Sequence, residues 1–302
     1  MSVKKFLIKK LQLSFYKRDV EEIKMLIGRQ LSNQNQERTK NIIDDIHQAE
    51  FKVFSQWGDD GIIQFLINYL DISNQFFIEF GVENYKEANT RFLMMNNNWS
   101  GLIIDGSEKN IQFVKSMKWY HYYDLIALHE FVTCENINKI LDENNIHGEI
   151  GLLHIDIDGN DYWIWKTINT ISPVIVIVEY NSLFGSDKHW TIPYNPTFDR
   201  TKAHPSNLYY GASISALCQL ANEKGYAFIG SNSNGNNAYF IRNDKLKGLK
   251  VLSPEEGYVY SKFKEGRNSD GSLSFLRAEN RYDVIRHLPV YNTLTCQYET
   301  IV

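Results

Sequence analysis

The stretch Phe76-Phe-Ile-Glu-Phe-Gly-Val-Glu-Asn84 decides the fold class of this 302-residue chain. Its apolar residues follow one another without a helical period, as in a parallel strand that is covered on both faces. Gly81 permits a sharp turn after this strand and a close approach of a ligand to the backbone. A second apolar stretch, Gly101-Leu-Ile-Ile-Asp105, ends in a carboxylate. We interpret the pair as half of a nucleoside-binding unit, in which the terminal acid accepts hydrogen bonds from ribose hydroxyl groups.

The alternation of strands and helices continues along the chain. Further strands are expected over 123–128, 151–156 and 174–179, and helices over 87–97, 108–117, 135–144, 162–170 and 214–224. Two last strands, 226–230 and 238–242, are joined by the turn-rich stretch 231–236 and read as a hairpin. This order predicts an α/β fold with a doubly wound, mostly parallel, seven-stranded sheet that ends in one antiparallel strand, preceded by N-terminal helices.

Three regions are predicted. Residues 1–50 form a helical extension with a break at 32–36, residues 51–245 form the main domain, and residues 246–302 form a C-terminal extension. Within the main domain, residues 181–210 make a long irregular segment that is rich in aromatic residues. Loops of this length in compact domains are usually functional or disordered, and the aromatic content favours an ordered lid.

The composition excludes several classes of partner. With 32 basic and 36 acidic residues the formal charge is −4, so no general attraction to nucleic acid or to an anionic membrane is expected. We expect no transmembrane segment and no signal peptide, and three scattered cysteines favour a reduced, cytoplasmic protein. The basic and apolar residues of the first 18 positions predict an amphipathic helix. It could pack on its own domain, contact a second copy in a homodimer, or lie on a membrane surface.

Several short motifs stand in a characteristic order: Phe54-Ser-Gln-Trp-Gly-Asp-Asp-Gly61, Asn89-Thr-Arg91, Trp99-Ser-Gly101, Leu152-Leu-His-Ile-Asp-Ile-Asp-Gly159 and Tyr210-Gly-Ala-Ser213. With Glu79, Gly81 and Asp105, this set resembles the class I S-adenosylmethionine-dependent methyltransferases, and the FkbM-like enzymes above all. The resemblance covers about residues 51–242 and implies a Rossmann-like fold. The chain departs from the family in its first motif, which carries one glycine instead of two or three.

The resemblance implies where S-adenosylmethionine would bind. Glu79 and Gly81 would flank its methionine part, Asp105, Gly106 and Ser107 would bind ribose and adenine, and Phe131 would lie near the adenine ring. The full set of cofactor-binding candidates is Gln56, Glu79, Gly81, Asn84, Asp105, Gly106, Ser107, Phe131 and Asp156. The residues alone leave a second interpretation of Asp105 open, as the cap of the following helix.

The segment from His154 to Asp161 holds the densest group of candidate catalytic residues. On an extended strand His154, Asp156 and Asp158 share one face, so Asp156 or Asp158 could act as general base. His154 could equally be a hydrogen-bonded strand histidine, and Gly159 would let the backbone turn toward a ligand. His189, in the lid, is a further catalytic candidate.

The next strand ends in Glu179-Tyr-Asn181 at the neighbouring position of the same sheet edge. Asp156, Glu179 and Asn181 could together bind a divalent cation such as Mg²⁺, which would acidify a substrate diol. The alternative is that these groups bind a polyhydroxylated substrate without a metal.

Three functions were compared. An O-methyltransferase that modifies a sugar or related polar metabolite in surface-glycan or natural-product biosynthesis agrees best with the ordered motifs. A metal-dependent glycosyltransferase would use Asp156 and Asp158 as an acid-x-acid motif. A non-catalytic nucleoside-binding protein could keep the same fold.

Overall fold

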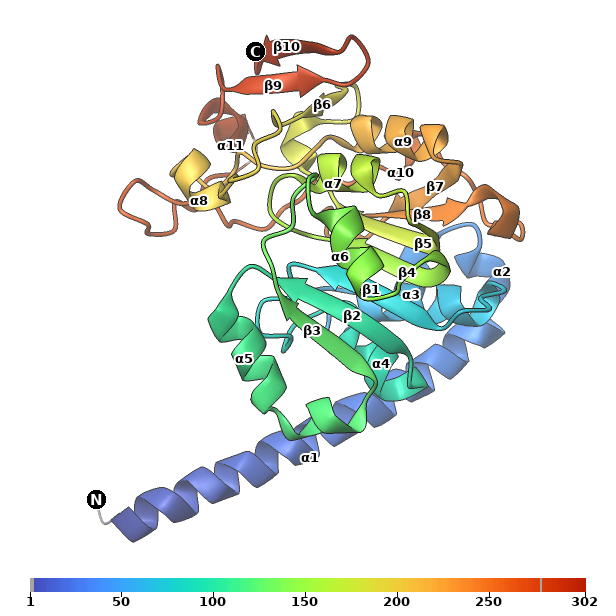
Figure 1. Ribbon diagram of the computed structural model, residues 1–302, viewed down its shortest axis with the longest axis vertical. Coiled ribbons are helices and arrows are strands. Elements are labelled where there is room, and N and C mark those ends of the chain that lie inside the picture. Colours follow the sequence, from blue (N-terminus) through green and yellow to red (C-terminus); the bar gives the residue numbers. More distant parts are fainter. Residues whose placement is uncertain (1–2, 278) are drawn as a thin grey trace.

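The computed structural model describes residues 3–277 and 279–302, with the side chains of residues 3–18 and Glu279 outside the description. Its centre is a seven-stranded sheet with the order β3-β2-β1-β4-β5-β8-β7 (Figure 1). The strands are β1 (Phe76–Phe80), β2 (Ser100–Asp105), β3 (Leu125–His129), β4 (Gly148–Ile155), β5 (Ile171–Glu179), β7 (Tyr226–Ser231) and β8 (Asn237–Arg242). The first five are parallel, which confirms the predicted doubly wound α/β fold. The winding reverses between β1 and β4, where such sheets bind ligands.

Helices cover both faces of the sheet. One face is covered by α3 (Asp59–Tyr69), α4 (Arg91–Asn97) and α5 (Glu108–Ser116), and the other by α6 (Ile137–Glu143), α7 (Asp161–Thr167) and α9 (Ile214–Glu223). Strand residues alternate between the two cores: Ile78 and Phe80 of β1 pack with α6 and α7, whereas Phe77 packs with α3. By the same alternation Glu79, His154, Glu179 and Asn237 all project toward the α3 face.

Helix α4 begins later than predicted. The expected helix over 87–97 starts at Arg91, because the backbone N–H groups of Asn89 and Thr90 donate to the Glu79 carboxylate at 2.9 and 3.0 Å. A buried acid on β1 thus holds the preceding residues in a loop.

The C-terminal hairpin forms as predicted, but the antiparallel strand is not the edge strand. β8 lies between β5 and β7 and is antiparallel to both. After α9 the chain forms β7 at the edge of the sheet. The hairpin then places β8 between β7 and β5. Asn237 is thereby set directly opposite Glu179.

The lid and the C-terminal extension form one packed unit. Strand β6 (Trp190–Thr191) of the lid pairs with β9 (Pro289–Asn292), which pairs with β10 (Gln297–Thr300), and this small sheet lies at the top of Figure 1. Lid residues such as Phe184 and Ile192 share a core with Ile285 and Val290. The remaining short helices are α8 (Arg200–Ala203), α10 (Pro254–Gly257) and α11 (Glu279–Asp283), with 3-10 turns η2 (Lys118–Tyr122), η3 (Ser182–Phe184) and η4 (Asn243–Lys245).

The N-terminal extension is one long helix, α1 (Val3–Glu37), followed by α2 (Thr39–Ile42) and the 3-10 turn η1 (Ile46–Ala49). The predicted break at 32–36 is wrong. Ser32 and Asn35 are buried against the body of the protein, where Asn35 donates to the Ala49 carbonyl at 2.7 Å, so packing overrides the weak helix propensity. The predicted amphipathic stretch in the first 18 residues lies outside the described side chains.

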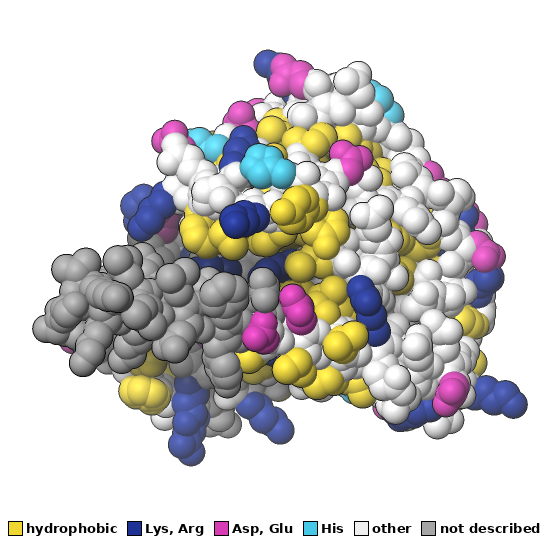
Figure 2. Space-filling model, turned by 90° about the horizontal axis from the view of Figure 1, so that it is seen from below, with side chains coloured by type: hydrophobic (Ala, Val, Ile, Leu, Met, Phe, Trp, Pro, Cys, Tyr) yellow, Lys and Arg dark blue, Asp and Glu magenta, His cyan; other side chains and the backbone are white. Residues whose placement is uncertain are grey.

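The first half of α1 extends beyond the body, and the second half packs against α3 (Figure 1). On the underside of the molecule, hydrophobic side chains are interspersed with single basic and acidic ones (Figure 2). None of the helices described here combines the length and the apolar character needed to cross a bilayer.

Candidate functional site

Two adjoining hollows open at the carboxyl ends of the parallel strands. The first, of about 180 Å³, lies over β1, β2 and β3 and is lined by residues including Asp105, Gly106, Phe131 and Val132. The second, of about 260 Å³, lies over β1, β4, β5 and β8, and we call it the acidic hollow. Its lining includes Gln56, Glu79, Glu87, His154, Glu179, Arg200, Asn237 and Glu265. Gly81, Glu83, Asp156 and Asp158 line both hollows, so a single elongated ligand could occupy the two.

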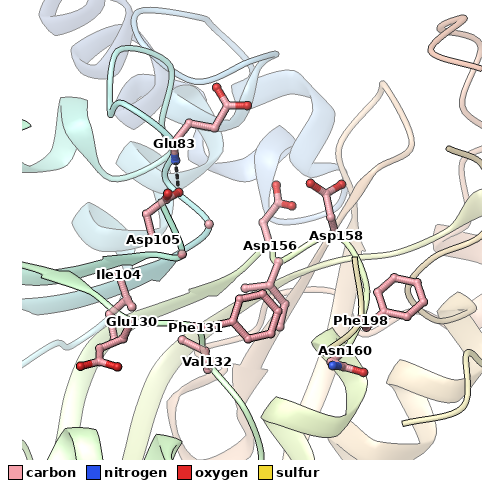
Figure 3. A pocket seen from close by; sticks show the side chains of 13 residues that line it. Glu83, Ile104, Asp105, Glu130, Phe131, Val132, Asp156, Asp158, Asn160 and Phe198 are labelled. Atoms are coloured by element: carbon pink, nitrogen blue, oxygen red, sulfur yellow. Dashed lines mark hydrogen bonds between the residues drawn. The ribbon is translucent and has the colours of Figure 1, made fainter. Parts of the chain in front are cut away.

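Asp105 organises the first hollow from the end of β2. Its Oδ2 accepts from the Glu83 N–H at 2.7 Å (Figure 3). Its Oδ1 accepts from the Ser107 N–H at 2.8 Å and the Asn110 Nδ2 at 3.1 Å. A carboxylate has about four lone-pair sites, so one site remains for a ligand hydroxyl group. The cap of α5 is Ser107. Asp105 therefore joins the two turns that frame the hollow and still presents an acceptor.

Gly81 sets the floor that the hollows share. It has φ +74°, and a Cβ built on it would lie 1.6 Å from the carbonyl oxygen of Asp156. Only glycine allows the turn after β1 to pass this close to the end of β4. Phe131 stands at the rim beside Gly106 with 51% of its surface exposed, which leaves an aromatic face available.

Glu79 and His154 form a buried pair on adjacent strands. Glu79 Oε1 lies 2.9 Å from His154 Nδ1, and its Oε2 accepts from the N–H and the hydroxyl group of Thr90. His154 Nε2 lies 3.1 Å from the Asn89 amide. Burial raises the pKa of Glu79, but His154 and Thr90 outweigh it, so the pKa lies below 4.5. Burial lowers the pKa of His154, but Glu79 outweighs it, so the pKa lies above 6.5. The opposite pKa shifts favour a charge-assisted contact between Glu79 and His154, and each side chain has a further partner.

Three other carboxylates meet in the acidic hollow. Oxygen atoms of Asp156, Asp158 and Glu179 lie within 4.8 Å of one another. Burial and the nearby Asp158 raise the pKa of Asp156, and burial and Asp156 raise the pKa of Glu179. Figure 3 shows the carboxylates of Asp156 and Asp158 pointing the same way. The cluster thus brings three acidic groups together at the ends of β4 and β5, where crowding and burial favour the protonated forms of Asp156 and Glu179.

The segment after β4 is not the extended strand that was expected. β4 ends at Ile155, and Asp158 adopts a left-handed conformation with φ +57°. Gly159 serves a different purpose from the one predicted, since a Cβ there would lie 2.3 Å from the Phe198 ring of the lid. Asp161 fixes the loop, because its carboxylate accepts from the N–H groups of Ile157 and Gly159 at 2.8 and 2.9 Å.

Arg200, which was not predicted from the sequence, enters the acidic hollow from the lid. Its guanidinium group bonds to Asp158, lies 3.0 Å from Glu265 and stacks on Tyr210, with Cζ 3.7 Å from the ring centroid. Among the described residues that line the hollow, Arg200 carries the only guanidinium or ammonium group. Glu265 was also missed. Neither residue lies in a motif, and only the packing of the lid and the C-terminal extension brings them here.

Four predicted site residues do not line either hollow. His189 lies outside both hollows, near the small sheet, where its Nδ1 lies 3.1 Å from the Gln219 side chain. The amide of Asn181 donates to the Leu208 and Tyr210 carbonyl groups at 3.0 Å, and its oxygen accepts from Leu183 N–H. Asn84 and Ser107 shape turns through backbone hydrogen bonds. Both polar atoms of the Asn181 side chain are therefore paired with the backbone of the lid.

No protein-family model and no curated protein matches the chain. A solved S-adenosylmethionine-dependent methyltransferase from Clostridium acetobutylicum is similar at 11% identity and a TM-score of 0.40, over 68% of this chain and 98% of its own.

Two further similar structures were solved with SAH. The O-methyltransferase from Bacillus cereus matches at 13% identity and a TM-score of 0.37, over 58% of this chain and 74% of its own. The N-terminal domain of EvdMO1 matches at 10% identity and a TM-score of 0.35, over 55% and 72%. These values assign no family to the chain.

Proposed function

We propose that the protein is an S-adenosylmethionine-dependent O-methyltransferase that acts on a hydroxyl group of a sugar or related polar metabolite, in surface-glycan or natural-product biosynthesis. The observation that carries the proposal is the joining of the two hollows. A ribose acceptor, Asp105, and a group suited to accept a proton, Asp156, lie on either side of the Gly81 turn that both hollows share.

The first hollow fits the nucleoside part of such a cofactor. Asp105 keeps one free acceptor position for a ribose hydroxyl group, and Phe131 offers an exposed ring face on which a base can stack. Gly81 lets the backbone approach the ligand closely. S-Adenosylmethionine would supply an electrophilic methyl group on a positively charged sulfur, and the adjacent carboxylates favour a positive charge at this place.

In the acidic hollow, Asp156 is the best candidate for the general base. Its raised pKa brings it closer to the operating pH, where a general base is most effective. His154, also predicted to be catalytic, has both ring nitrogens engaged by Glu79 and Asn89, so we assign it a positioning role. The hollow carries many carboxylates, which favours a neutral, hydroxyl-rich acceptor over a phosphate or a carboxylate. The predicted divalent cation, such as Mg²⁺, would assist by acidifying the acceptor hydroxyl.

Thermal denaturation of the full chain with ligands tests the proposal. S-Adenosylhomocysteine at about a hundredfold excess over its dissociation constant stabilises a folded protein by about 2.7 kcal/mol. For 302 residues this corresponds to an increase of about 4 °C in Tm. No shift with S-adenosylhomocysteine, together with a shift from uridine or guanosine diphosphate plus Mn²⁺, would replace the proposal with the glycosyltransferase alternative.

Two variants test whether the increase in Tm comes from binding in the first hollow. Asp105→Asn keeps the size of the side chain but loses the negative charge that holds two turns, and should remove most of the shift. Asp142→Asn is the matched control, since Asp142 is exposed on α6 and contacts only His147 among its described ion-pair partners. Equal shifts in the two variants would show that the ligand does not use the first hollow.

A further inference from the structure

We infer that the acidic hollow is a binding site for one hard divalent cation, held by Asp156, Asp158, Glu179 and the side-chain oxygen of Asn237. The inference deepens the proposed transferase, since the cation would lie beside the acceptor. Cation binding is nevertheless measured without cofactor or transfer, so the two proposals can fail separately.

The spacing of the three acids suits a single cation. Calcium and magnesium bind carboxylate oxygens at about 2.0–2.6 Å, so two ligands of one cation lie at most about 5 Å apart. The oxygens of Asp156, Asp158 and Glu179 satisfy this limit at 4.8 Å or less. They come from neighbouring places in the fold, since Glu179 ends β5 and the two aspartates follow β4. All-oxygen donors select a hard cation over zinc or copper.

Two buried oxygens without partners provide evidence independent of this spacing. Among the described residues, Glu179 Oε2 and Asn237 Oδ1 accept no hydrogen bond. Both side chains line the acidic hollow, and their residues are only 7% and 3% exposed. An unpaired buried acceptor is destabilising, and more so when it is charged. A bound cation would satisfy both atoms at once.

The orientation of the Asn237 amide is fixed by Asp59. A carboxylate only accepts, so the amide nitrogen of Asn237 must be the atom that faces Asp59 Oδ1, at 3.0 Å. Asp59 is itself held by the Tyr239 hydroxyl at 2.6 Å and the Asn232 amide at 3.0 Å. The amide oxygen of Asn237 therefore does not face Asp59, and it has no hydrogen-bond partner among the described residues. Asp59 is thus a positioning residue behind a ligand, as is common around protein-bound metals.

Arg200 supplies the opposing charge. It bonds to Asp158 from the lid helix α8 and lies between that carboxylate and Glu265. One guanidinium group faces three clustered acids and Glu265, so the acidic groups outnumber the cationic one. An arriving cation competes with Arg200 for Asp158. Cation affinity should therefore increase when the arginine is removed, whereas a purely structural arginine would have no such effect.

Isothermal titration of the chelator-treated full chain with Mg²⁺, Mn²⁺ and Ca²⁺, one at a time, tests the site. We expect one cation per chain. Glu179→Gln and Asn237→Ala should weaken binding by about tenfold or more, since even supporting residues of metal sites contribute about 10–100-fold. Glu87→Gln is the matched control: Glu87 lines the same hollow but pairs with Lys52 at 3.2 Å, so its loss should change affinity less than about twofold if ligation and not general acidity binds the cation.

Two further results separate ligand loss from misfolding. Without cation, Glu179→Gln should unfold at the same or a higher temperature than the wild type, because the buried Glu179 carboxyl group then has an oxygen without a partner. Arg200→Gln should bind the cation more tightly. No binding of any of the three ions at millimolar concentration to the folded protein would overturn the inference, and so would equal losses in Glu179→Gln and Glu87→Gln. If no cation bound but S-adenosylhomocysteine still raised the Tm, the cation inference would be wrong and the transferase proposal would be unaffected.

Discussion

Gly81→Ala tests the contact between the turn after β1 and the end of β4. The added Cβ would lie 1.6 Å from the Asp156 carbonyl oxygen, whereas Cβ contacts in proteins are essentially never below 3.0 Å. The two strand ends would have to separate by well over an ångström. Because Asp156 follows β4 directly, the displacement acts on both hollows at once.

Two energetic costs add at this position. The left-handed backbone, with φ +74°, costs an alanine about 1–2 kcal/mol. Overpacking against a rigid neighbour costs about another 1–3 kcal/mol. A chain of 302 residues has an unfolding entropy of about 0.6 kcal/mol per kelvin, so the sum corresponds to a decrease in Tm of about 3–8 °C.

Gly148→Ala is a matched control for the backbone cost. Gly148 has φ +71° at the start of β4, and its Cβ would meet nothing within 4 Å. It should lose only the conformational part, about 2–3 °C, and keep the response to S-adenosylhomocysteine. Differential scanning calorimetry with and without the ligand measures both effects. If Gly81→Ala unfolded at the temperature of Gly148→Ala and kept its ligand response, the close approach of β1 to β4 would have no role in the site.

Two further predictions separate binding from stability. Phe131→Ala should weaken S-adenosylhomocysteine binding by about 1–3 kcal/mol through lost stacking, while Tm without ligand stays unchanged, because the ring is 51% exposed; equal affinity by calorimetric titration would remove Phe131 from the site. The Glu79–His154 pair should stabilise the fold most between pH 4.5 and 6.5. The depressed pKa of Glu79 makes its contribution disappear as pH falls through the folded-state value, and the raised pKa of His154 makes its contribution disappear as pH rises through its own. The Tm difference between wild type and His154→Gln should shrink on both sides of that window, and a flat difference would mean that the pair is not ionised.

The order of strands and helices was predictable because it depends on local apolar patterns. Buried parallel strands such as β5 contain a continuous run of β-branched residues. This local pattern is typical of a strand that is covered on both faces. The break predicted near Ser32 failed for the opposite reason. Polar residues there have low helix propensity, yet contacts such as that of Asn35 with Ala49 hold the helix together. Local preference yields to packing where the preference is weak.

The site was predictable only where its residues follow strand ends. Asp105, Asp156 and Glu179 come directly at or after strands, so the sheet topology alone brings them to one edge. Asn237 and Arg200 could not be assigned in this way. Asn237 reaches Glu179 because β8 enters the sheet antiparallel beside β5, a placement that hairpin patterns do not specify. The position of Arg200 depends on the fold of the irregular lid. The lid sequence has no helical or strand periodicity from which this fold could be predicted.

Glu79 and Glu179 are both buried carboxylates, but they differ in their hydrogen-bond partners. Both project toward the α3 face at the carboxyl ends of parallel strands, and both are buried, at 2% and 7% exposure. Glu79 receives His154, Thr90 and Asn89 as donors, whereas one oxygen of Glu179 receives none from the described residues. A fold able to compensate one buried carboxylate so fully gains nothing in stability by leaving the other uncompensated. We therefore infer that the partner of this Glu179 oxygen is a bound cation. For this reason we expect Glu179→Gln to weaken cation binding and not the stability of the fold.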